Sequence, residues 1–525
     1  MATARERLTL PLSPAADLRG VGDALKLKLG TNRIILASNR GPVQYRRDRR
    51  GDLVAQRGQG GLVTALTSLL RHTRVSWVAS SMSPADREAA RHLERSPKHR
   101  LLDDSLRLRL VNVAGNVYRR HYQVFSNPVL WLLQHSLAGE LAERPSTMVK
   151  EAWRWGYLPV NRALARAVVE ELNEPDTVPW VFIHDYHLYL TGLFIRQQVP
   201  NAFLQHFTHI PWPEPGEGVR HLGPIWKEIL RGLLSNDIVG FQTEDHVLNF
   251  LNDCRLSLPE AQVDYSTNSV FQLGRTVGVR AYPISVDVSE LRETSESMEF
   301  AVYRHQLASL CSEFTIVKVE RVDPTKNTIL SLEAFRRLLT VHPELVGRAT
   351  MLAFLVPSRT SIPEYRRFTQ RLMDTVDSVN SQFVMPGYLP VRVFYENNYL
   401  QALAGMSLYD VLLVNPVADG MNLVAKEGPI VNKKDGVVVL SETAGAYTQL
   451  WPGVLSVRPD DIDGTAEALY QGLFMQREER RRRASYLRTS IQREDLTDWL
   501  GRQMQDALAV VSQPGGKVRM ATLPV

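Results

Sequence analysis

Short apolar segments alternate with longer amphipathic segments along most of the chain, beginning near residue 33. Several of the apolar segments are rich in Val, Ile or Phe and end in polar residues, which is typical of parallel strands buried on both faces. These predicted strands are Ile34–Ala37, Trp180–Ile183, Phe203–Phe207, Ile316–Val319, Met351–Val356, Val411–Val414 and Gly436–Leu440. Helical periodicity predicts helices over Gly60–Arg71, Val160–Leu172, Asp245–Leu251 and Thr328–Thr340. The alternation predicts an α/β fold with doubly wound sheets.

The length of the chain, 525 residues, favours two large domains over a single core. A boundary is predicted at Tyr282–Asp287, because a new helical segment follows it and a second series of strands begins at Phe314. We therefore expect an N-terminal extension (1–30), a first Rossmann-like domain (31–284), a second (285–512) whose last helix can pack back on the first, and a flexible tail (513–525). Two such domains would face each other across a cleft, with ligands beyond the carboxyl ends of the strands.

Composition narrows the class of protein. Hydrophobic residues make up 44% and charged residues 22% of the chain, and no apolar run reaches the roughly 18 residues that span a bilayer. The first residues include charged Arg5, Glu6 and Arg7 and lack the apolar stretch of a signal peptide. The two cysteines, Cys254 and Cys311, form no disulfide framework. We therefore expect a cytoplasmic protein without membrane contact. The formal charge of +6 suits anionic small molecules better than nucleic acid.

Two basic runs have structural interpretations. The run 46–50 precedes Gly51 and predicts a solvated loop or hairpin tip. The run 477–483 places acidic residues three or four positions before basic ones, which indicates an exposed helix face.

Polar residues that follow the strands of the first half are candidates for binding. Arg40 follows the first strand, and Gly60 and Gly61 open the next predicted helix, where backbone N–H groups could approach a phosphate. The alternative for Arg40 is a surface ion pair, and the alternative for the two glycines is an ordinary tight turn. The sequences His184-Asp185-Tyr186-His187 and His209-Ile210-Pro211 follow two further strands. Their spacing does not predict a metal site, and a core histidine bonded to backbone is the alternative for each.

The second half carries a stronger pattern. Arg321 and Lys326 lie five residues apart between a strand and a helix, so both can reach one diphosphate, although Glu320 and Asp323 could instead form a structural ion-pair cluster with them. The block 419–427 follows a strand and opens a helix. Its Asp419 could bind sugar hydroxyls, its N–H groups could bind phosphate, and Glu427 could accept from a ribose diol.

Together these blocks resemble glycosyltransferase family 20, the trehalose-6-phosphate synthase family, from Arg33 to about Leu500. The motifs occur in the family's order: SNR, GGL, YQVFSNPVLW (122–131), HDYHL, HIPWP, DIVGFQTE (237–244), YPI, ERVDPTK, PSR (357–359), DGMNLVAKE and LSETAG (440–445). The resemblance implies a GT-B fold and retaining transfer of glucose from UDP- or GDP-glucose to glucose 6-phosphate, giving α,α-trehalose 6-phosphate.

The resemblance also implies roles for individual residues. The implied donor-binding residues are Gly60, Gly61, His209, Arg321, Lys326, Asp419, Gly420, Met421, Asn422, Leu423, Val424 and Glu427. The implied acceptor-binding residues are Arg40, Tyr122, Trp131, Asp185 and Arg359, and the implied catalytic set is Asp185, His209, Arg321, Lys326 and Asp419. No cofactor or metal is expected, because two cations can neutralise the diphosphate, and a homo-oligomer is compatible with the family.

Three positions depart from the family pattern and leave alternatives open. Ala418 replaces an Arg, Asn327 a Gly and Ser80 the second Trp of a W-x-x-W stretch. Some features also resemble the validoxylamine-phosphate synthase branch of the family. A glucosylglycerol-phosphate synthase, a pseudo-glycosyltransferase of that branch and a catalytically silent regulatory subunit are therefore alternatives, although the four retained residues Arg321, Lys326, Asp419 and Glu427 argue against a silent chain.

Overall fold

Two mainly parallel β-sheets form the framework of this computed structural model, which describes residues 32–57, 73–94, 105–141 and 145–512. In spatial order the first sheet contains β5 (Leu106–Val111), β4 (Arg74–Ser80), β1 (Arg33–Ser38), β6 (Thr177–His184), β7 (Phe203–Phe207), β8 (Ile238–Phe241), β11 (Arg275–Ala281), β10 (Ser269–Gln272) and β9 (Gln262–Asp264). The second contains β14 (Val391–Phe394), β13 (Ala349–Val356), β12 (Phe314–Arg321), β15 (Val411–Val414), β16 (Val437–Ser441) and β17 (Leu455–Val457). A separate hairpin joins β2 (Val43–Arg47) to β3 (Leu53–Arg57).

The strand order of both sheets is doubly wound. In each sheet the first strand in sequence, β1 or β12, lies in the interior, the next two lie on one side of it and the later ones on the other. All pairs in the second sheet are parallel, and only β9 and β10 add antiparallel pairs at the edge of the first. The order reverses between β1 and β6 and between β12 and β15, so each sheet has a point at which the loops that follow neighbouring strands diverge. The predicted α/β fold is confirmed.

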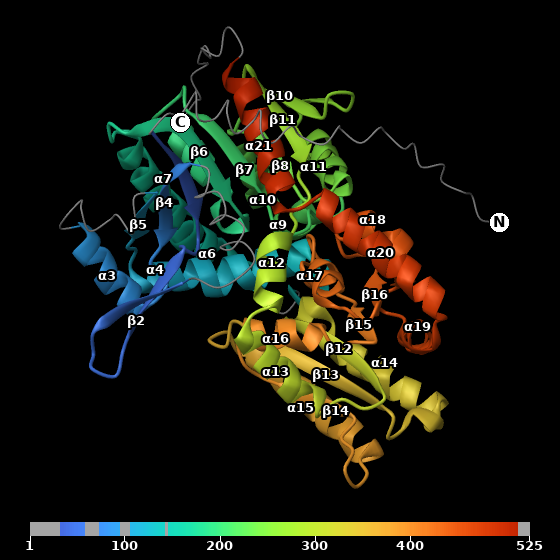
Figure 1. Ribbon diagram of the computed structural model, residues 1–525. Helices are drawn as coiled ribbons and strands as arrows, with labels where there is room; N and C mark the ends of the chain where they lie inside the picture. The colour runs from blue at the N-terminus through green and yellow to red at the C-terminus, as the bar shows by residue number, and fades with distance from the viewer. Residues whose placement is uncertain (1–31, 58–72, 95–104, 142–144, 513–525) are drawn as a thin grey trace.

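Helices cover both sheets (Figure 1). With the first sheet lie α3 (Pro84–Glu94), α4 (Gly115–Arg119), the π-helix η2 (Arg120–Leu130), α5 (Trp131–Gln134), η3 (Ala138–Leu141), α6 (Ser146–Ala152), η4 (Trp153–Tyr157), α7 (Leu158–Leu172), η5 (Tyr186–Leu188), α8 (Thr191–Arg196), α9 (Glu217–Leu222), α10 (Pro224–Leu233) and α11 (Glu244–Ser257). The later helices are α12 (Val288–Ser295), α13 (Met298–Ala308), η6 (Pro324–Lys326), α14 (Thr328–Val341), η7 (Pro343–Leu345), α15 (Pro363–Phe383), α16 (Tyr399–Met406), α17 (Val424–Val431), α18 (Tyr447–Leu450), η8 (Trp451–Gly453), α19 (Ile462–Phe474), α20 (Arg477–Arg493) and α21 (Leu496–Val511).

Every predicted strand and helix that falls within the described residues occurs in the structure. All seven predicted strands coincide with β1, β6, β7, β12, β13, β15 and β16, and three of the predicted helices coincide with α7, α11 and α14. The fourth predicted helix, Gly60–Arg71, lies outside the described residues. The basic run 46–50 forms the tip of the β2–β3 hairpin, as predicted, and the run 477–483 begins α20, where Arg482 and Arg483 pair with Glu479. No helix in the described part of the chain is long and apolar enough to cross a membrane.

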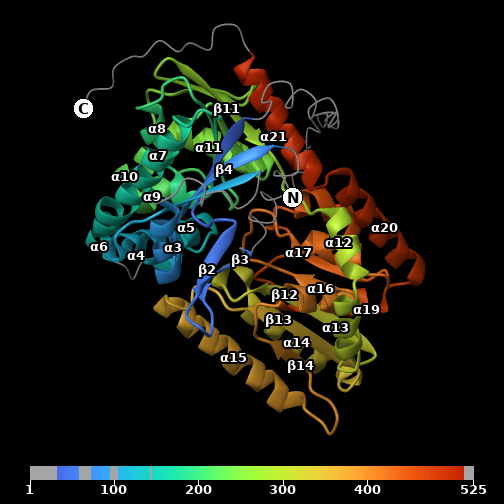
Figure 2. The same ribbon diagram turned by 60° about the vertical axis from the view of Figure 1, so that its left-hand side comes forward.

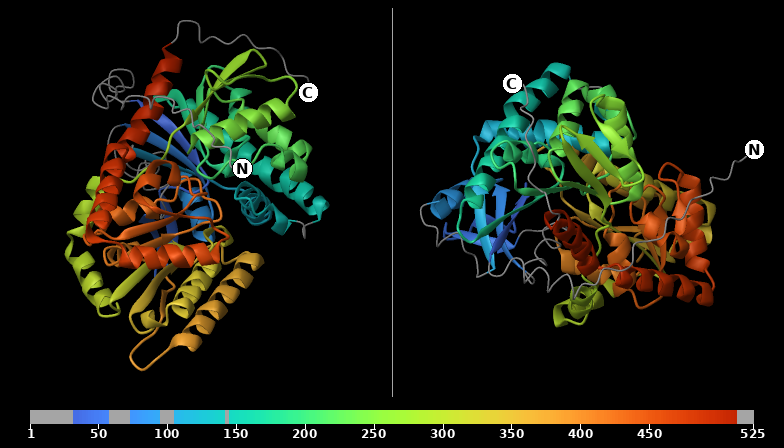
Figure 3. Two further views of the ribbon diagram at one scale, coloured as in Figure 1. Left: turned by 90° about the vertical axis from the view of Figure 1, so that its right-hand side faces the viewer. Right: turned by 90° about the horizontal axis from the view of Figure 1, so that it is seen from above.

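The chain crosses between the two sheets twice at neighbouring positions. The segment that leads from β11 to α12 is the first crossing, and the segment between α20 and α21 is the second, where the N–H of Leu496 donates to the carbonyl of Val286. Figure 2 and Figure 3 show α20 beside the second sheet and α21 continuing onto the first. The side chain of Gln503 on α21 meets that of Gln205 on β7 at 2.7 Å, and the phenol of Tyr282 donates to Asp506 at 2.5 Å.

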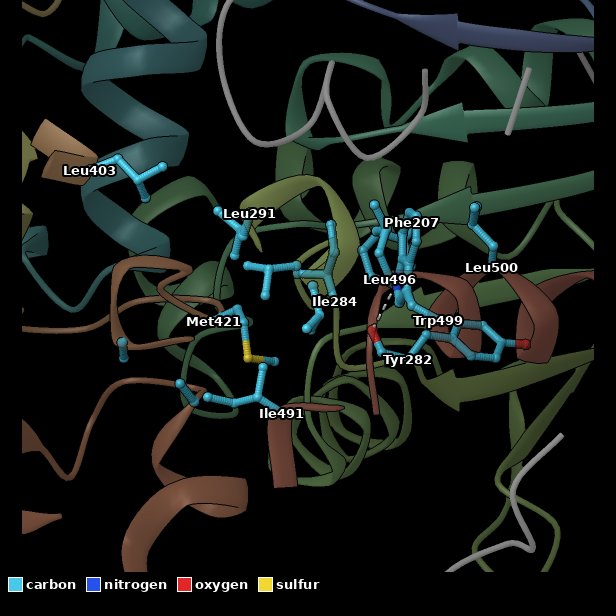
Figure 4. Packing of buried hydrophobic residues seen from close by; sticks show 14 of the residues in the cluster. Phe207, Tyr282, Ile284, Leu291, Leu403, Met421, Ile491, Leu496, Trp499 and Leu500 are labelled. Carbon is cyan, nitrogen blue, oxygen red and sulfur yellow. Dashed lines mark hydrogen bonds between the residues drawn. The ribbon is translucent and has the colours of Figure 1, made fainter. Parts of the chain in front are cut away.

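Buried apolar side chains pack together at the two crossings (Figure 4). The indole of Trp499 is 1% exposed, lies edge-on to Phe207 and donates to the carbonyl of Tyr282 at 3.2 Å. Leu291 and Met421 belong to the same buried cluster. The cluster therefore draws on both sheets and on both crossings, so it holds the two sheets at one relative position.

Truncation of this indole should weaken the whole chain. We expect Trp499→Ala to cost about 3–5 kcal/mol, the usual range for deleting a buried aromatic side chain. Denaturant unfolding followed by circular dichroism measures the shift of the midpoint. Leu256→Ala is the control, because Leu256 is 62% exposed and its truncation should change stability by at most about 0.5 kcal/mol. A midpoint shift of Trp499→Ala no larger than that of the control would contradict this view of the crossing.

Candidate functional site

The predicted site residues lie just beyond the carboxyl ends of strands from both sheets. Arg40 follows β1, Asp185 follows β6 and His209 follows β7, whereas Arg321 ends β12 and Asp419 follows β15. These strands lie at or next to the positions where the strand order reverses. Parallel strands bring their carboxyl ends to one edge, so residues far apart in sequence become neighbours there.

Trp131 joins the two halves of this site. It begins α5, which follows the π-helix η2, and its indole N–H donates to Asp323 of the second half at 3.1 Å. The guanidinium carbons of Arg359 and Arg321 lie 4.0 Å and 5.3 Å from the centre of a Trp131 ring, distances typical of cation–π contacts. The structure thus brings Trp131 and Arg359 of the predicted acceptor set together with Arg321 of the predicted donor set.

Arg359 is held by a buried network. It forms an ion pair with Asp323, and the side chains of these two residues are 5% and 0% exposed. Its guanidinium also donates to the phenol oxygens of Tyr365 at 2.6 Å and Tyr186 at 3.2 Å. Burial opposes ionisation of Asp323, but the Arg359 and Arg321 guanidiniums outweigh it and lower the pKa of Asp323 to about 2. The carboxylate is therefore charged throughout the ordinary pH range.

Asp185 combines backbone strain with a buried charge. Its φ is +78°, a conformation that non-glycine residues adopt at an energetic cost, often at functional sites. Its N–H donates to the carbonyl of Phe207 at 2.8 Å, and its Oδ1 is buried without a hydrogen-bond partner among the described residues. Burial raises the pKa of Asp185 to about 6. Buried polar atoms are nearly always bonded, so a partnerless oxygen at this position fits the acceptor-sugar role predicted for it.

The backbone of His209 lies against the loop that follows β15 in the second half. Its ring meets that of His184 at 3.2 Å between nitrogens, and burial lowers the pKa of both side chains, so both rings are neutral near pH 7. A Cβ placed on Gly420 would lie 2.0 Å from the carbonyl oxygen of His209. Only glycine therefore lets the loop after β15 approach the loop after β7 so closely.

The residues predicted to bind the donor are already in contact with one another. Lys326 forms an ion pair with Asp419, and the side-chain amide of Asn422 donates to the same carboxylate oxygen at 3.0 Å. Burial opposes this charge, but Lys326 lowers the pKa of Asp419 below its usual value. Asn422 has a φ of +78° and leads through Leu423 into α17. Arg321 forms no direct ion pair among the described residues, but its charge contributes to lowering the pKa of Asp323.

Glu427, at the far end of the predicted donor site, has a hydrogen-bond partner that the sequence did not predict. The phenol of Tyr399, the first residue of α16, donates to Oε1 of Glu427 on α17 at 3.1 Å. Burial raises the pKa of Glu427 to about 7. The asparagine-rich stretch before Tyr399 marks a helix start but carries no signal of this contact. Asp323 and Tyr186 were present in the quoted motifs, but their contacts with Arg359 were not predicted.

Tyr122 stands in a column of stacked rings. Its ring lies 5.7 Å from that of Tyr118 and 5.8 Å from that of His187, with interplanar angles of 12° and 14°. Burial lowers the pKa of His187, and His121, Arg359 and Arg40 contribute to the shift. Gly60 and Gly61 lie outside the described residues, so their predicted phosphate contact stays a prediction.

One of the three departures from the family pattern has a local explanation. Asn327 has a φ of +63°, a left-handed conformation that Gly and Asn tolerate best, and its amide donates to the carbonyls of Asn415 at 3.1 Å and Pro459 at 2.7 Å. Ser80 ends β4 with its side chain buried, and nothing in the structure explains the Ser at this position. Nothing in the structure explains Ala418, which is 8% exposed.

The sequence profile of glycosyltransferase family 20 matches residues 32–509. The chain belongs to this family. A bifunctional trehalose-6-phosphate synthase/phosphatase from Thermoproteus tenax is 32% identical over 483 residues, which are 89% of this chain and 62% of that protein. The chain thus spans about three fifths of the length of this relative. A UDP-forming α,α-trehalose-phosphate synthase from Candida albicans is 30% identical, over 85% of this chain and 91% of that one.

Solved structures agree with this family assignment. A trehalose-6-phosphate structure from E. coli, bound with UDP-2-fluoro glucose, matches with a TM-score of 0.77 and 26% identity, over 90% of this chain and 98% of that chain. A UDP-forming α,α-trehalose-phosphate synthase from Burkholderia xenovorans, in complex with glucose-6-phosphate, matches with a TM-score of 0.77 and 27% identity, over 90% and 99%. The GT-B fold predicted from the sequence is confirmed.

Loss of the buried Asp323 carboxylate should lower the free energy of unfolding of this protein. Asp323→Asn leaves the Arg359 guanidinium buried without its counter-charge, and breaking a buried pair in this way costs about 3–5 kcal/mol. Denaturant unfolding measures this loss. Asp460→Asn is the matched control, since its pair with Arg458 is about 70% exposed on both sides and should be worth at most about 1 kcal/mol. Equal stability of the two variants would show that Asp323 is not the counter-charge of Arg359.

Proposed function

We propose that this chain is an α,α-trehalose-phosphate synthase, which transfers glucose from UDP-glucose to glucose 6-phosphate with retention of the α-configuration. The observation that carries the proposal is the meeting of Arg321, Lys326 and Asp419, the predicted donor group, with Trp131 and Arg359, the predicted acceptor group, at one junction of the two sheets. The names of the similar proteins, several of them UDP-forming, support UDP-glucose over GDP-glucose as the donor.

In the proposed reaction, Arg321 and Lys326 hold the diphosphate of the donor. Negative charge grows on the leaving phosphate oxygen as the bond to the sugar breaks, and both cations stabilise it more strongly in the transition state than in the ground state. Lys326 would exchange its contact with Asp419 for the diphosphate, which leaves the carboxylate for donor sugar hydroxyls. The leaving oxygen takes the proton of the acceptor hydroxyl on the same face.

The acceptor would lie on the other side of the junction. Arg359 and Arg40 offer positive charge to its phosphate, and the ring of Tyr122 and the indole of Trp131 form walls. The partnerless Oδ1 of Asp185 would accept from an acceptor hydroxyl. The neutral ring of His209 can hydrogen-bond the donor sugar without adding a charge that would compete with the diphosphate. Because both cysteines are unpaired thiols, we place this activity in the cytoplasm.

Purified protein offered defined donors and acceptors tests the activity. UDP-glucose and GDP-glucose are each combined with glucose 6-phosphate, with glycerol 3-phosphate or with no acceptor, and products are identified by mass. We expect trehalose 6-phosphate from UDP-glucose and glucose 6-phosphate. A glucosylglycerol phosphate product, or no product from any pair, would contradict the proposal.

The cations at the diphosphate should act on the rate. Arg321→Ala or Lys326→Ala removes a contact that strengthens as the phosphate leaves, so we expect a loss of about 2–4 kcal/mol of transition-state stabilisation, roughly a hundredfold or more in kcat/KM. Steady-state kinetics measure this loss. Arg337→Ala is the control, because Arg337 forms an exposed ion pair between α14 and α19 with Asp463 and has no predicted role in the site. Near-normal turnover of Arg321→Ala and Lys326→Ala would overturn the proposed donor site.

Arg359 should act on the acceptor. Removing one charged hydrogen bond costs about 1.5–3 kcal/mol, so Arg359→Lys, which keeps the positive charge beside Asp323 but loses the guanidinium fork, should raise the KM for glucose 6-phosphate by roughly ten- to a hundredfold. The affinity for UDP-glucose, measured by calorimetry without acceptor, should change little. An unchanged KM for glucose 6-phosphate would remove Arg359 from the acceptor site.

A further inference from the structure

A buried ion pair that the proposed reaction does not use lies on β12, close to the end that carries Arg321. Lys318 and Glu320 face the same side of this strand, because residues two positions apart on a strand do so. The Nζ of Lys318 lies 2.8 Å from a carboxylate oxygen of Glu320, and the two side chains are 1% and 7% exposed. The sequence left an ion pair of Glu320 with Arg321 and Lys326 open, but among the described residues its ion-pair partner is Lys318.

The Lys318–Glu320 pair is poorly explained by a gain in stability. Each ion loses its hydration on burial, and well-packed neutral residues of similar volume are often as stable as a buried pair. Burial lowers the pKa of Lys318 and raises that of Glu320, although the attraction between the two charges opposes both shifts. Burial therefore outweighs the attraction, and the groups that the two charges hold in place give the better explanation.

Glu320 is bonded to the start of α14, and through it to the turn that carries Lys326. Its Oε1 accepts a hydrogen bond from the hydroxyl of Thr328, the first residue of α14. Lys326 ends η6 two residues earlier, and only Asn327, with its left-handed backbone, separates the two. The hydrogen bond from Thr328 therefore fixes the chain directly after the turn.

Lys318 is bonded to the segment that leads to Asp419. Its Nζ donates at 3.0 Å to Oδ1 of Asn415, the first residue after β15. The same oxygen accepts from the hydroxyl of Ser331 on α14 at 2.6 Å. Lys318, Asn415 and Ser331 are all buried, so these bonds are shielded from competition by water.

The two segments are also bonded directly to each other. The N–H of Val417 donates to the carbonyl of Thr325 at 2.9 Å, one residue before Lys326 and two residues before Asp419. Lys326 and Asp419 then form the ion pair described above. One buried network therefore determines where a predicted diphosphate cation and a predicted sugar-binding carboxylate lie relative to each other.

We propose that Lys318 and Glu320 are positioning residues, which hold the segments that carry Lys326 and Asp419 in the relative position needed to bind the donor. Neither side chain contacts the donor in this proposal. The identity of the donor as a nucleoside diphosphate sugar rests on the proposed function, whereas the connection of both segments to the Lys318–Glu320 pair rests on the hydrogen bonds. Positioning matters because a displacement of about 1 Å can cost about a hundredfold in rate.

Calorimetry with UDP tests the positioning role without depending on turnover. The double variant Lys318→Met/Glu320→Gln removes both charges at similar side-chain length, so no buried charge is left without a partner. We expect its UDP affinity to fall about tenfold, while its denaturant midpoint stays close to that of the wild type. Glu313→Gln is the matched control, because it makes the same change in an exposed ion pair with Arg348 beside the opposite end of β12. It should keep UDP affinity within about twofold of the wild type.

Steady-state kinetics separate a positioning role from a general loss of structure. In the double variant we expect kcat/KM for UDP-glucose to fall by about tenfold or more, whereas the KM for glucose 6-phosphate stays within about twofold. UDP affinity and kcat/KM that both match those of the control would overturn the proposal. An equal rise of both KM values would also overturn it, because it would show a general loss of structure.

Thr328→Val keeps the proposal testable if the double variant does not fold. This change removes the hydroxyl that links Glu320 to the start of α14 and leaves both charges in place. We expect UDP binding to weaken by about threefold to tenfold, as the usual net value of one hydrogen bond predicts. Because Thr328 and Glu320 act through one contact, adding Thr328→Val to Glu320→Gln should cause little further loss. Additive losses, or a UDP affinity of Thr328→Val within about twofold of the wild type, would contradict the proposal.

The same measurements distinguish the positioning role from the proposed function. If the chain binds UDP but forms no trehalose 6-phosphate, weaker UDP binding in the variants still supports the role of the Lys318–Glu320 pair. Normal synthesis with unchanged UDP affinity in the variants leaves the proposed function intact and removes this role. A wild-type chain that binds neither UDP nor GDP would overturn both.

Discussion

The buried ion pair between Arg359 and Asp323 is the interaction on which the site depends. A guanidinium and a carboxylate taken out of water lose several kcal/mol of hydration each, and their attraction compensates only if the remaining donors and acceptors are also bonded. Here the indole of Trp131 and the phenol of Tyr186 supply part of that bonding, and both come from the first half of the chain. The pair is therefore satisfied only when the two halves are in contact, which is also the arrangement that brings the predicted donor and acceptor groups together.

Backbone strain directs side chains from the strand ends into that junction. Asp185, Asn327, Arg359 and Asn422 all have φ between +48° and +78°. Each such residue costs on the order of 1–3 kcal/mol unless its surroundings fix it, and strain of this kind is commonly kept at binding sites. In Asn327 two side-chain hydrogen bonds to carbonyls offset the cost. In Arg359 the buried ion pair has the same effect, so the strain and the junction support each other.

Burial shifts the pKa values of several site residues and so affects which of them are charged. Burial lowers the pKa values of His184 and His209 and keeps both rings neutral, so neither histidine adds charge where a diphosphate or phosphate would bind. Burial also raises the pKa of Asp185 and Glu427, the two carboxylates predicted to meet sugar hydroxyls. Carboxylates that are costly to ionise in the free protein gain most from hydroxyl donors supplied by a ligand.

The sequence by itself determined the order of strands and helices, the polar clusters at the strand ends and the family. A short, continuous apolar segment such as 411–414 predicts a strand buried on both faces. The position of such a strand could therefore be predicted from the sequence. Spacing placed Arg321 and Lys326 together, and the family resemblance added Asp419, which follows another parallel strand of the same sheet. Only the tertiary structure decided that Asp323 is the counter-charge of Arg359, that Trp131 lies against both arginines and that Tyr399 holds Glu427. These contacts join residues 28 to 228 positions apart, and local sequence carries no record of which distant partner a buried charge or ring will meet.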